Sequence, residues 1–162
     1  MTKEIEKMLD AQINKEFHSA YLYLGIANYF AGKNLNGFAS WYKVQAAEEQ
    51  EHAMKIYDYM VENGCQVSLP ALEAVTVSYD SPLAAVEAAD KHEHYITDEI
   101  TKIYHAAVEA KDYRVQLFLN WFIQEQEEEE QNSADMVAKV KVMGDSDKHL
   151  YILDKEVGGR QG

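Results

Sequence analysis

Apolar residues recur at steps of three and four along four long stretches of this chain, and that period is the period of an α-helix. The stretches cover about residues 2–31, 36–63, 81–111 and 112–143, and a short amphipathic piece covers about 146–158. Only eight Gly and two Pro occur among 162 residues, which leaves room for helices of this length. The sequence therefore predicts an all-α fold with four long helices and a short C-terminal fifth helix, in one domain spanning residues 1–162.

Several helix boundaries carry their own signals. Ser81-Pro82 is typical of an N-cap followed by proline at the first helical position, and Asp112 is placed to cap the fourth helix. Residues 144–147 break the helical pattern before the short fifth helix. After that helix, we expect residues 158–162 to form a frayed tail.

The connections predict how the four long helices run. Short turns link the first helix to the second and the third to the fourth, which makes two antiparallel hairpins. About 16 residues, from Cys65 to Asp80, link the second helix to the third without a helical period. A segment of that length can run the length of the bundle, so the second and third helices can be parallel. We therefore expect a four-helix bundle with one long crossover.

Polar side chains interrupt the apolar stripe of every long helix. Glu16, for example, lies between Ile13 and Ala20 on the first stripe. We expect Leu24 and Ile123 to face inward as apolar members of their stripes. A buried carboxylate costs several kcal/mol unless it is neutralised or paired, and no Lys or Arg shares these stripes nearby, so a multivalent cation is the expected partner. The full polar set is Glu16, Glu49 and His52 from the first two helices, with Glu93, Gln126 and Glu129 from the other two.

The spacing of these residues gives a second argument for a metal site. Glu49 and His52 form a Glu-x-x-His pattern, which places both side chains one turn apart on one helix face. Glu16 precedes Glu49 by 33 positions, and Glu93 precedes Gln126 by 33 positions as well. The two hairpins therefore read as an internal pseudo-repeat whose halves face each other. Carboxylates with one imidazole suit iron or manganese better than copper(I), and the lack of thiolates argues against structural zinc.

Charge and cysteine content narrow the range of partners. The formal net charge is −13, which disfavours nucleic acid and anionic membranes and favours cations. Cys65 is the only cysteine, so neither an intramolecular disulfide nor a multi-cysteine metal site is expected. The N-terminus lacks a basic start followed by an apolar run, and no stretch approaches the roughly 18 apolar residues of a membrane span. We therefore expect a cytoplasmic protein.

Four stretches of this sequence resemble the bacterial and archaeal non-haem ferritins, and the resemblance covers essentially the whole chain. They are NKEFHSAYLY around Glu16, AAEEQEHAM around Glu49, KHEHYIT around Glu93 and WFIQEQEEEE around Gln126. The C-terminal LYILDKEV is similar to the short fifth helix of that family. The resemblance implies a ferritin-like bundle in a homo-oligomeric shell of 24 subunits. It also implies that Fe(II) is oxidised by O2 or H2O2 and stored as a ferric mineral.

The resemblance further implies roles for individual residues at a two-iron ferroxidase centre. Glu49 would bridge the two ions. Tyr23 lies seven positions after Glu16 and corresponds to a tyrosine beside the centre, for which an electron-donating role is a hypothesis. The remaining positions that match the centre are Glu16 and His52 for the first iron, with Glu93, Gln126 and Glu129 for the second.

A third iron site of the bacterial type is implied nearby, and haem is not. The third site would use Glu48, Glu125 and Glu128 together with Glu129. Gln50 stands where bacterioferritins have their haem-binding methionine, so no haem is expected. The second half also lacks the Glu-x-x-His pattern that bacterioferritins repeat there.

Two other functions fit part of this pattern. A rubrerythrin-like diiron oxidase or peroxidase would use the same bundle without mineral storage, although its rubredoxin-like cysteines are missing here. A non-catalytic helical scaffold would leave the inward carboxylates unexplained. A small oligomer would favour the first alternative. A metal-free protein that is stable and does not bind iron would favour the second.

Overall fold

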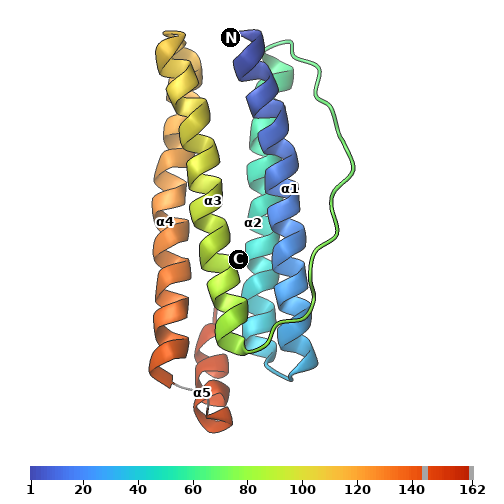
Figure 1. Ribbon diagram of the computed structural model, residues 1–162, viewed down its shortest axis with the longest axis vertical. Helices are drawn as coiled ribbons and strands as arrows, with labels where there is room; N and C mark the ends of the chain where they lie inside the picture. The colour runs from blue at the N-terminus through green and yellow to red at the C-terminus, as the bar shows by residue number, and fades with distance from the viewer. Residues whose placement is uncertain (144–145, 161–162) are drawn as a thin grey trace.

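Five helices make up the regular structure of the computed structural model, which describes residues 1–143 and 146–160 (Figure 1). They are α1 (Lys3–Gly32), α2 (Asn36–Glu62), α3 (Pro82–Glu109), α4 (Tyr113–Met143) and α5 (Asp147–Val157). No strand occurs among the described residues, and the all-α prediction is confirmed. The expected break at Gly144–Asp145 and the last tail residues, Gln161 and Gly162, lie outside the described ranges.

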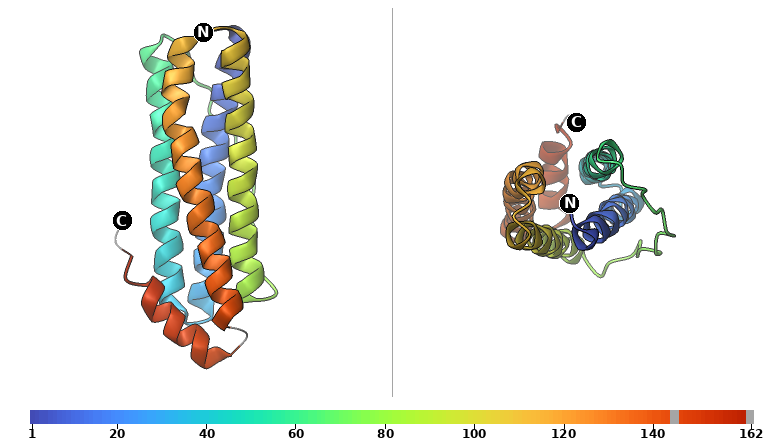
Figure 2. Two further views of the ribbon diagram at one scale, coloured as in Figure 1. Left: turned by 90° about the vertical axis from the view of Figure 1, so that its left-hand side faces the viewer. Right: turned by 90° about the horizontal axis from the view of Figure 1, so that it is seen from above.

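The four long helices lie side by side as a bundle, and α5 folds across one end of it (Figures 1 and 2). α1 with α2 and α3 with α4 form antiparallel hairpins, as the short turns predict. The crossover between α2 and α3, residues 63–81, runs along the outside of α1 from one end of the bundle to the other (Figure 1). α2 and α3 therefore run in the same direction. None of the described helices combines the length and the apolar character that crossing a membrane requires.

Side-chain caps fix where α3 and α4 begin. The Ser81 hydroxyl accepts a hydrogen bond from the Ala84 N–H at 3.0 Å, and Pro82 follows it at the first position of α3. The Asp112 carboxylate accepts a hydrogen bond from the Val115 N–H at 3.2 Å, at the start of α4. Each cap satisfies an N–H that has no partner inside its own helix. Both expected N-caps are therefore confirmed.

The core consists of two apolar clusters with a polar layer between them. One cluster lies toward the end of the bundle that α5 covers and includes Phe30, Phe38 and Leu153. The other lies toward the N-terminus of α1 and includes Leu9 and Ile100. Each long helix passes from one cluster to the other, and its polar interruption lies at that passage. This arrangement sets the candidate site in the middle of the bundle.

Three expectations about individual residues are wrong. Leu24 and Ile123 are 45% and 38% exposed, because the preceding residues, Tyr23 and Phe122, take the inward positions. A helix turns by about 100° per residue, so only one of two adjacent side chains can face the core directly. Arg160 is not frayed, because its guanidinium binds two side chains of α2.

Candidate metal centre

The polar layer consists of six side chains that are almost completely buried, and all of them are residues that interrupt the apolar stripes. Every one of the helices α1 to α4 contributes at least one of them. Their exposed fractions do not exceed 4%. They are Glu16, Glu49, His52, Glu93, Gln126 and Glu129.

The first hairpin brings three possible ligands together. Glu16, Glu49 and His52 each offer one donor atom, and these atoms lie within 4.8 Å of one another. His52 Nδ1 lies 3.3 Å from Glu49 Oε2. Gln12 Nε2 donates a hydrogen bond to Glu16 Oε1 at 2.9 Å, whereas the buried Glu16 Oε2 has no hydrogen-bond partner in the protein. Because a buried oxygen without a partner is costly, this geometry fits a cation bound between the three side chains.

A second group of possible ligands shares the same histidine. His52, Glu125 and Glu129 also place one donor atom each within 4.8 Å of one another, with His52 Nε2 3.8 Å from Glu125 Oε1. Gln45 Nε2 donates a hydrogen bond to Glu129 Oε2 at 2.5 Å. The Trp121 ring meets the imidazole edge-on, with the ring centroids 5.4 Å apart. A neutral imidazole has one lone pair, so His52 can be a ligand in only one of the two groups at a time.

Glu93 is oriented by neighbours from both hairpins. The Tyr23 hydroxyl donates a hydrogen bond to Glu93 Oε1. Gln126 Nε2 donates to Glu93 Oε2 at 3.2 Å and contacts the Thr97 hydroxyl oxygen, also at 3.2 Å. Both carboxylate oxygens therefore have a fixed partner, and Glu93 enters the layer in a defined orientation.

Burial raises the pKa of every carboxyl group in the layer. It raises the pKa of Glu16 to about 8, and the charge of Glu49 adds to the effect. The pKa of Glu129 rises to about 8 through burial and the charge of Glu93, and burial raises the pKa of Glu93 to about 7. The pKa of Glu49 also lies well above its usual range, because of burial and the charges of Glu93 and Glu129. Protons therefore limit the charge of the layer, and a bound cation can replace them.

Two buried glutamines support the carboxylates, and the sequence pattern could have revealed them. Gln12 and Gln45 lie four positions before Glu16 and Glu49, so they too are 33 positions apart. Both are polar residues on an apolar stripe, which is the same signal that marked the carboxylates. Arg160 carries no such signal, because its place depends on how the tail folds back onto α2.

The four glutamates of the implied third site are only partly brought together. Glu125 and Glu129 share the group around His52. Glu48 is partly buried, and its Oε2 lies 2.6 Å from a guanidinium nitrogen of Arg160. Glu128 is exposed and belongs to neither group. Any third site at these residues would therefore lie at the edge of the polar layer rather than within it.

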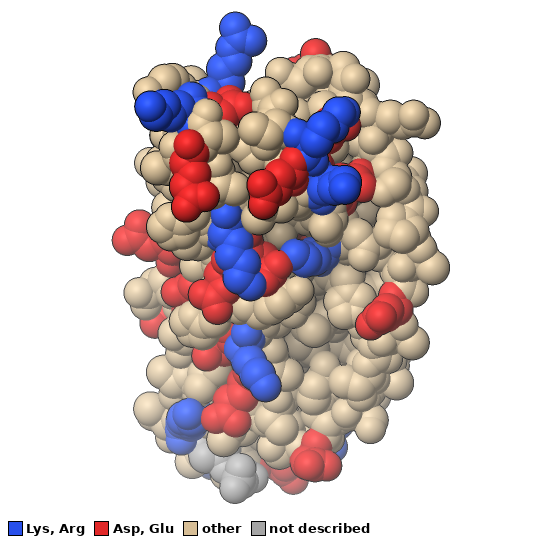
Figure 3. Space-filling view, turned by 45° about the horizontal axis from the view of Figure 1, so that its top comes forward, with Lys and Arg blue, Asp and Glu red and all other residues tan. Residues whose placement is uncertain are grey.

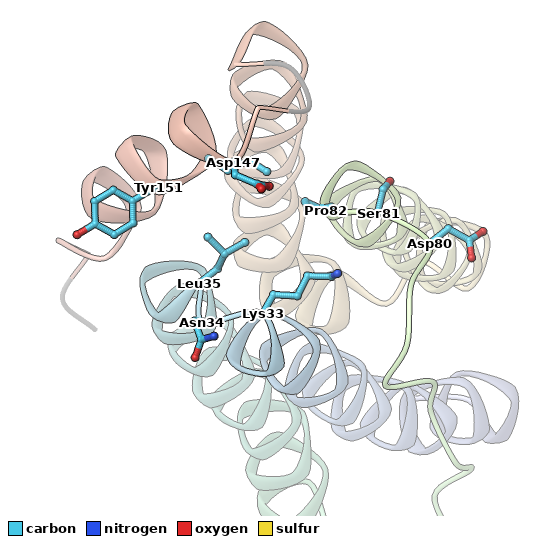
Figure 4. Close-up of a pocket in the computed structure, with 9 residues that line it drawn as sticks. Lys33, Asn34, Leu35, Asp80, Ser81, Pro82, Asp147 and Tyr151 are labelled. Atoms are coloured by element: carbon cyan, nitrogen blue, oxygen red, sulfur yellow. The ribbon is translucent and has the colours of Figure 1, made fainter.

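A pocket of about 690 Å³ lies away from this layer, at the end of the bundle (Figure 4). The turn between α1 and α2, the start of α3 and the first part of α5 surround it. Asp80, Asp147 and Tyr151 are among its nine lining residues, and no residue of the polar layer is. The candidate chemistry is therefore inside the bundle and not in this surface pocket.

Known proteins that are similar to this chain include ferritins. A family model described as ferritin-like domain matches residues 6–143. A probable bacterial non-heme ferritin-like protein of Haemophilus influenzae is 33% identical over 98% of this chain and 96% of its own length. A bacterial non-heme ferritin of Campylobacter jejuni is 32% identical over 97% and 94%. The open pore ferritin of the archaeon Archaeoglobus fulgidus has a TM-score of 0.97 at 41% identity, with 99% of each chain covered. From its matching sequence, its bundle and its single long crossover, the chain belongs to the ferritin-like family, together with the bacterial and archaeal non-haem ferritins.

Proposed function

We propose that this protein is an iron-storage ferritin that oxidises Fe(II) inside each subunit and stores the Fe(III) as a mineral within a hollow shell of 24 subunits. The observation that carries the proposal is the buried polar layer, where four carboxylates and one imidazole meet between two apolar clusters. No Lys or Arg is buried with them among the described residues. Such a layer costs stability unless a cation completes it. Iron as the cargo is supported by the family and by relatives that are named ferritins.

Two Fe(II) ions are the substrates that the layer would hold. Glu16 and His52 bind the first ion, and Glu49 is shared between both. Four carboxylate charges balance the charges of two Fe(II) ions. The remaining groups, which belong to the second ion, are Glu93, Glu129 and the neutral Gln126.

Oxidation changes this charge balance and favours release of the product. Each Fe(II) gives up one electron, so one pair of ions supplies the two electrons that reduce O2 to H2O2, or H2O2 to water. Fe(III) carries a charge that four carboxylates no longer balance, and oxygen ligands derived from water must supply the difference. The neutral amide of Gln126 adds no charge to hold the oxidised pair. The site therefore suits iron that passes through rather than iron that stays.

Two side chains beside the layer have proposed supporting roles. The Tyr23 hydroxyl donates a hydrogen bond to Glu93, a proposed ligand of the second ion, so its oxidisable ring lies beside a residue of the polar layer. We assign it an electron-donating role in turnover. The outer glutamates would receive iron that leaves the pair, as a third position before the cavity of the shell; they are Glu48, Glu125 and Glu128, with Glu129 as the link to the layer.

Addition of Fe(II) in air to the metal-free protein, at many iron ions per subunit, tests the proposal. We expect ferric absorbance to rise faster than in protein-free buffer, and we expect dense, iron-loaded particles in a later sedimentation run. Oxidation that stops at about two iron ions per subunit, with no mineral and a small oligomer, would instead indicate the rubrerythrin-like oxidase. Oxidation no faster than in buffer would contradict any ferroxidase role.

A further inference from the structure

The described end of the chain places a positive charge against Glu48, one of the outer glutamates. After α5 the chain turns back along α2 (Figure 2), and Arg160 Nη2 lies 2.6 Å from Glu48 Oε2. Arg160 Nη1 donates a hydrogen bond to Gln45 Oε1 at 2.8 Å. The guanidinium also lies over the Trp41 ring, 4.3 Å from its centroid. Three different groups therefore hold one cationic head group, although residues 158–160 belong to no helix.

The three partners of Arg160 form one stripe on α2. Trp41, Gln45 and Glu48 follow at steps of four and three, so they occupy successive turns of one helix face. The binding place is therefore built into a rigid element. Only the arginine must move if the contact is to open.

Gln45 connects this guanidinium to the metal-binding layer. Its amide oxygen accepts from Arg160, and its amide nitrogen donates to Glu129 Oε2 at 2.5 Å. An amide has a donor nitrogen and an acceptor oxygen, so Gln45 can donate to Glu129 and accept from Arg160 at the same time. The two hydrogen bonds therefore hold the Gln45 amide with its oxygen toward Arg160 and its nitrogen toward Glu129.

We propose that Arg160 is a built-in cation that occupies the Glu48 carboxylate and, through Gln45, keeps Glu129 Oε2 engaged in a hydrogen bond, so that neither group is free for a metal ion at the outer glutamates. A metal ion that binds at Glu48 must displace the guanidinium, because both compete for the same carboxylate charge. Displacement also releases Gln45, so that Glu129 Oε2, which Gln45 holds, becomes free to bind the ion beside Glu125. This inference rests on the proposed function, since it assigns a gate to the path by which iron leaves the layer.

Burial and charge favour an exchange of this kind. The side chain of Arg160 is 17% exposed and that of Glu48 is 35% exposed, so water and ions reach the pair without unfolding of the bundle. An ion pair at that exposure is worth little, and its opening is correspondingly easy. Other cations near the tail have different partners: Lys139 pairs with Glu156, and Lys155 lies over the Tyr151 ring.

Zinc titration of the metal-free protein tests the gate without any redox step. Zn²⁺ binding would be followed by calorimetry in the wild type, in Arg160→Gln and in Arg160→Lys, with Lys155→Gln as a control that removes the same charge elsewhere in the C-terminal segment. We expect the weakest class of sites to tighten roughly three- to tenfold in Arg160→Gln, the range set by one partly exposed charged hydrogen bond. The zinc affinity of the weakest class in Arg160→Lys should lie between those of the wild type and Arg160→Gln, because one ammonium cannot bind Glu48 and Gln45 together as a planar guanidinium does. Lys155→Gln should match the wild type.

A second variant separates competition from a merely structural effect. In Glu48→Gln the carboxylate that binds both Arg160 and the metal is gone, so adding Arg160→Gln should change the weakest zinc class no further. Equal zinc affinities in the wild type and Arg160→Gln, with the tight sites intact, would overturn the gate and leave the proposed function standing. If the wild-type protein itself showed no tight zinc sites, that result would instead contradict the proposed metal centre.

Discussion

A buried glutamate of the polar layer avoids an unpaired charge either by keeping a proton or by binding a cation. Glu16 and Glu129, each with a pKa raised to about 8, keep their protons at neutral pH when no metal is present. Metal binding must therefore release protons, and apparent metal affinity should rise with pH. The burial that makes these residues costly in the metal-free protein also makes them responsive to a cation.

Replacement of the shared ligand should stop rapid oxidation. In Glu49→Ala the carboxylate between the two proposed ions is lost, and we expect the initial rate of Fe(II) oxidation to fall at least roughly tenfold, which is the cost of losing even an outer partner of a metal site. Glu51→Ala is the matched control, because Glu51 is exposed on the same helix. Stopped-flow absorbance measures both variants. An unchanged initial rate in Glu49→Ala would rule out the assigned centre.

The metal-free protein should become less stable as pH rises from about 5 to 8. The folded pKa of Glu16, about 8, lies above the ordinary glutamate pKa of 4.5, so the folded state binds more protons than the unfolded state in this interval. Stability then falls as pH rises, and the stabilising contribution of the bound proton is lost through pH 8. Thermal unfolding in the presence of a chelator measures this slope. Glu16→Gln mimics the protonated side chain and should flatten it, and a slope of the opposite sign would contradict the raised pKa.

At the scale of the helices, the start of α2 depends on α5. α2 has no side-chain cap from its own N-terminal residues, and Asp154 of α5 supplies one by accepting a hydrogen bond from the Phe38 N–H at 2.9 Å. The helices also approach closely at Gly37, where an added Cβ would lie only 1.7 Å from the Asp154 backbone oxygen. A residue larger than glycine would push α5 off the bundle. The short fifth helix is therefore a structural part of the bundle end.

Removal of this cap should destabilise the bundle end measurably. Asp154→Ala leaves the Phe38 N–H without its partner, and we expect a loss of about 1–2 kcal/mol. For a chain of this size that corresponds to a fall of roughly 2–8 °C in melting temperature. Asp58→Ala, at an exposed position on α2, is the control and should melt with the wild type. Equal melting temperatures for Asp154→Ala and the control would show that α5 contributes nothing to the start of α2.

The elements also show which parts of the structure a sequence can predict. Helix positions and the polar layer follow from local periodicity, so the inward place of Glu16 and Glu93 is readable from a few neighbouring turns. The contacts of Asp154 and Arg160 join residues more than 100 positions apart, and nothing in the local pattern encodes them. The prediction that Leu24 faces inward is wrong for a third reason: the spacing of apolar residues gives the centre of the buried stripe but not its width. Local rules therefore located the candidate site, and tertiary contacts supply its supporting residues.

At the scale of the whole molecule, charge and apolar surface act in opposite directions on assembly. The subunit carries a formal net charge of −13, so identical subunits repel one another. Exposed apolar side chains on α1 and the crossover, including Leu24, Leu69 and Val77, favour association. Figure 3 shows charged side chains gathered mainly on the left and centre of one face, while the right-hand part is largely uncharged. The balance between the two forces depends on how far salt screens the charges.

Assembly of the metal-free protein should therefore increase with ionic strength. The screening length falls from about 30 Å at 0.01 M salt to about 3 Å at 1 M, so repulsion between neighbouring subunits weakens while apolar burial persists. We expect the mean particle mass in analytical ultracentrifugation to rise from low to high NaCl, and to do so equally in KCl, because screening does not depend on which monovalent cation supplies it. Particles that dissociate as salt rises would mean that ion pairs between subunits, rather than apolar contacts, hold the assembly together. A mass that does not change with salt would place the charged residues too far from the subunit contacts for the net charge of −13 to matter.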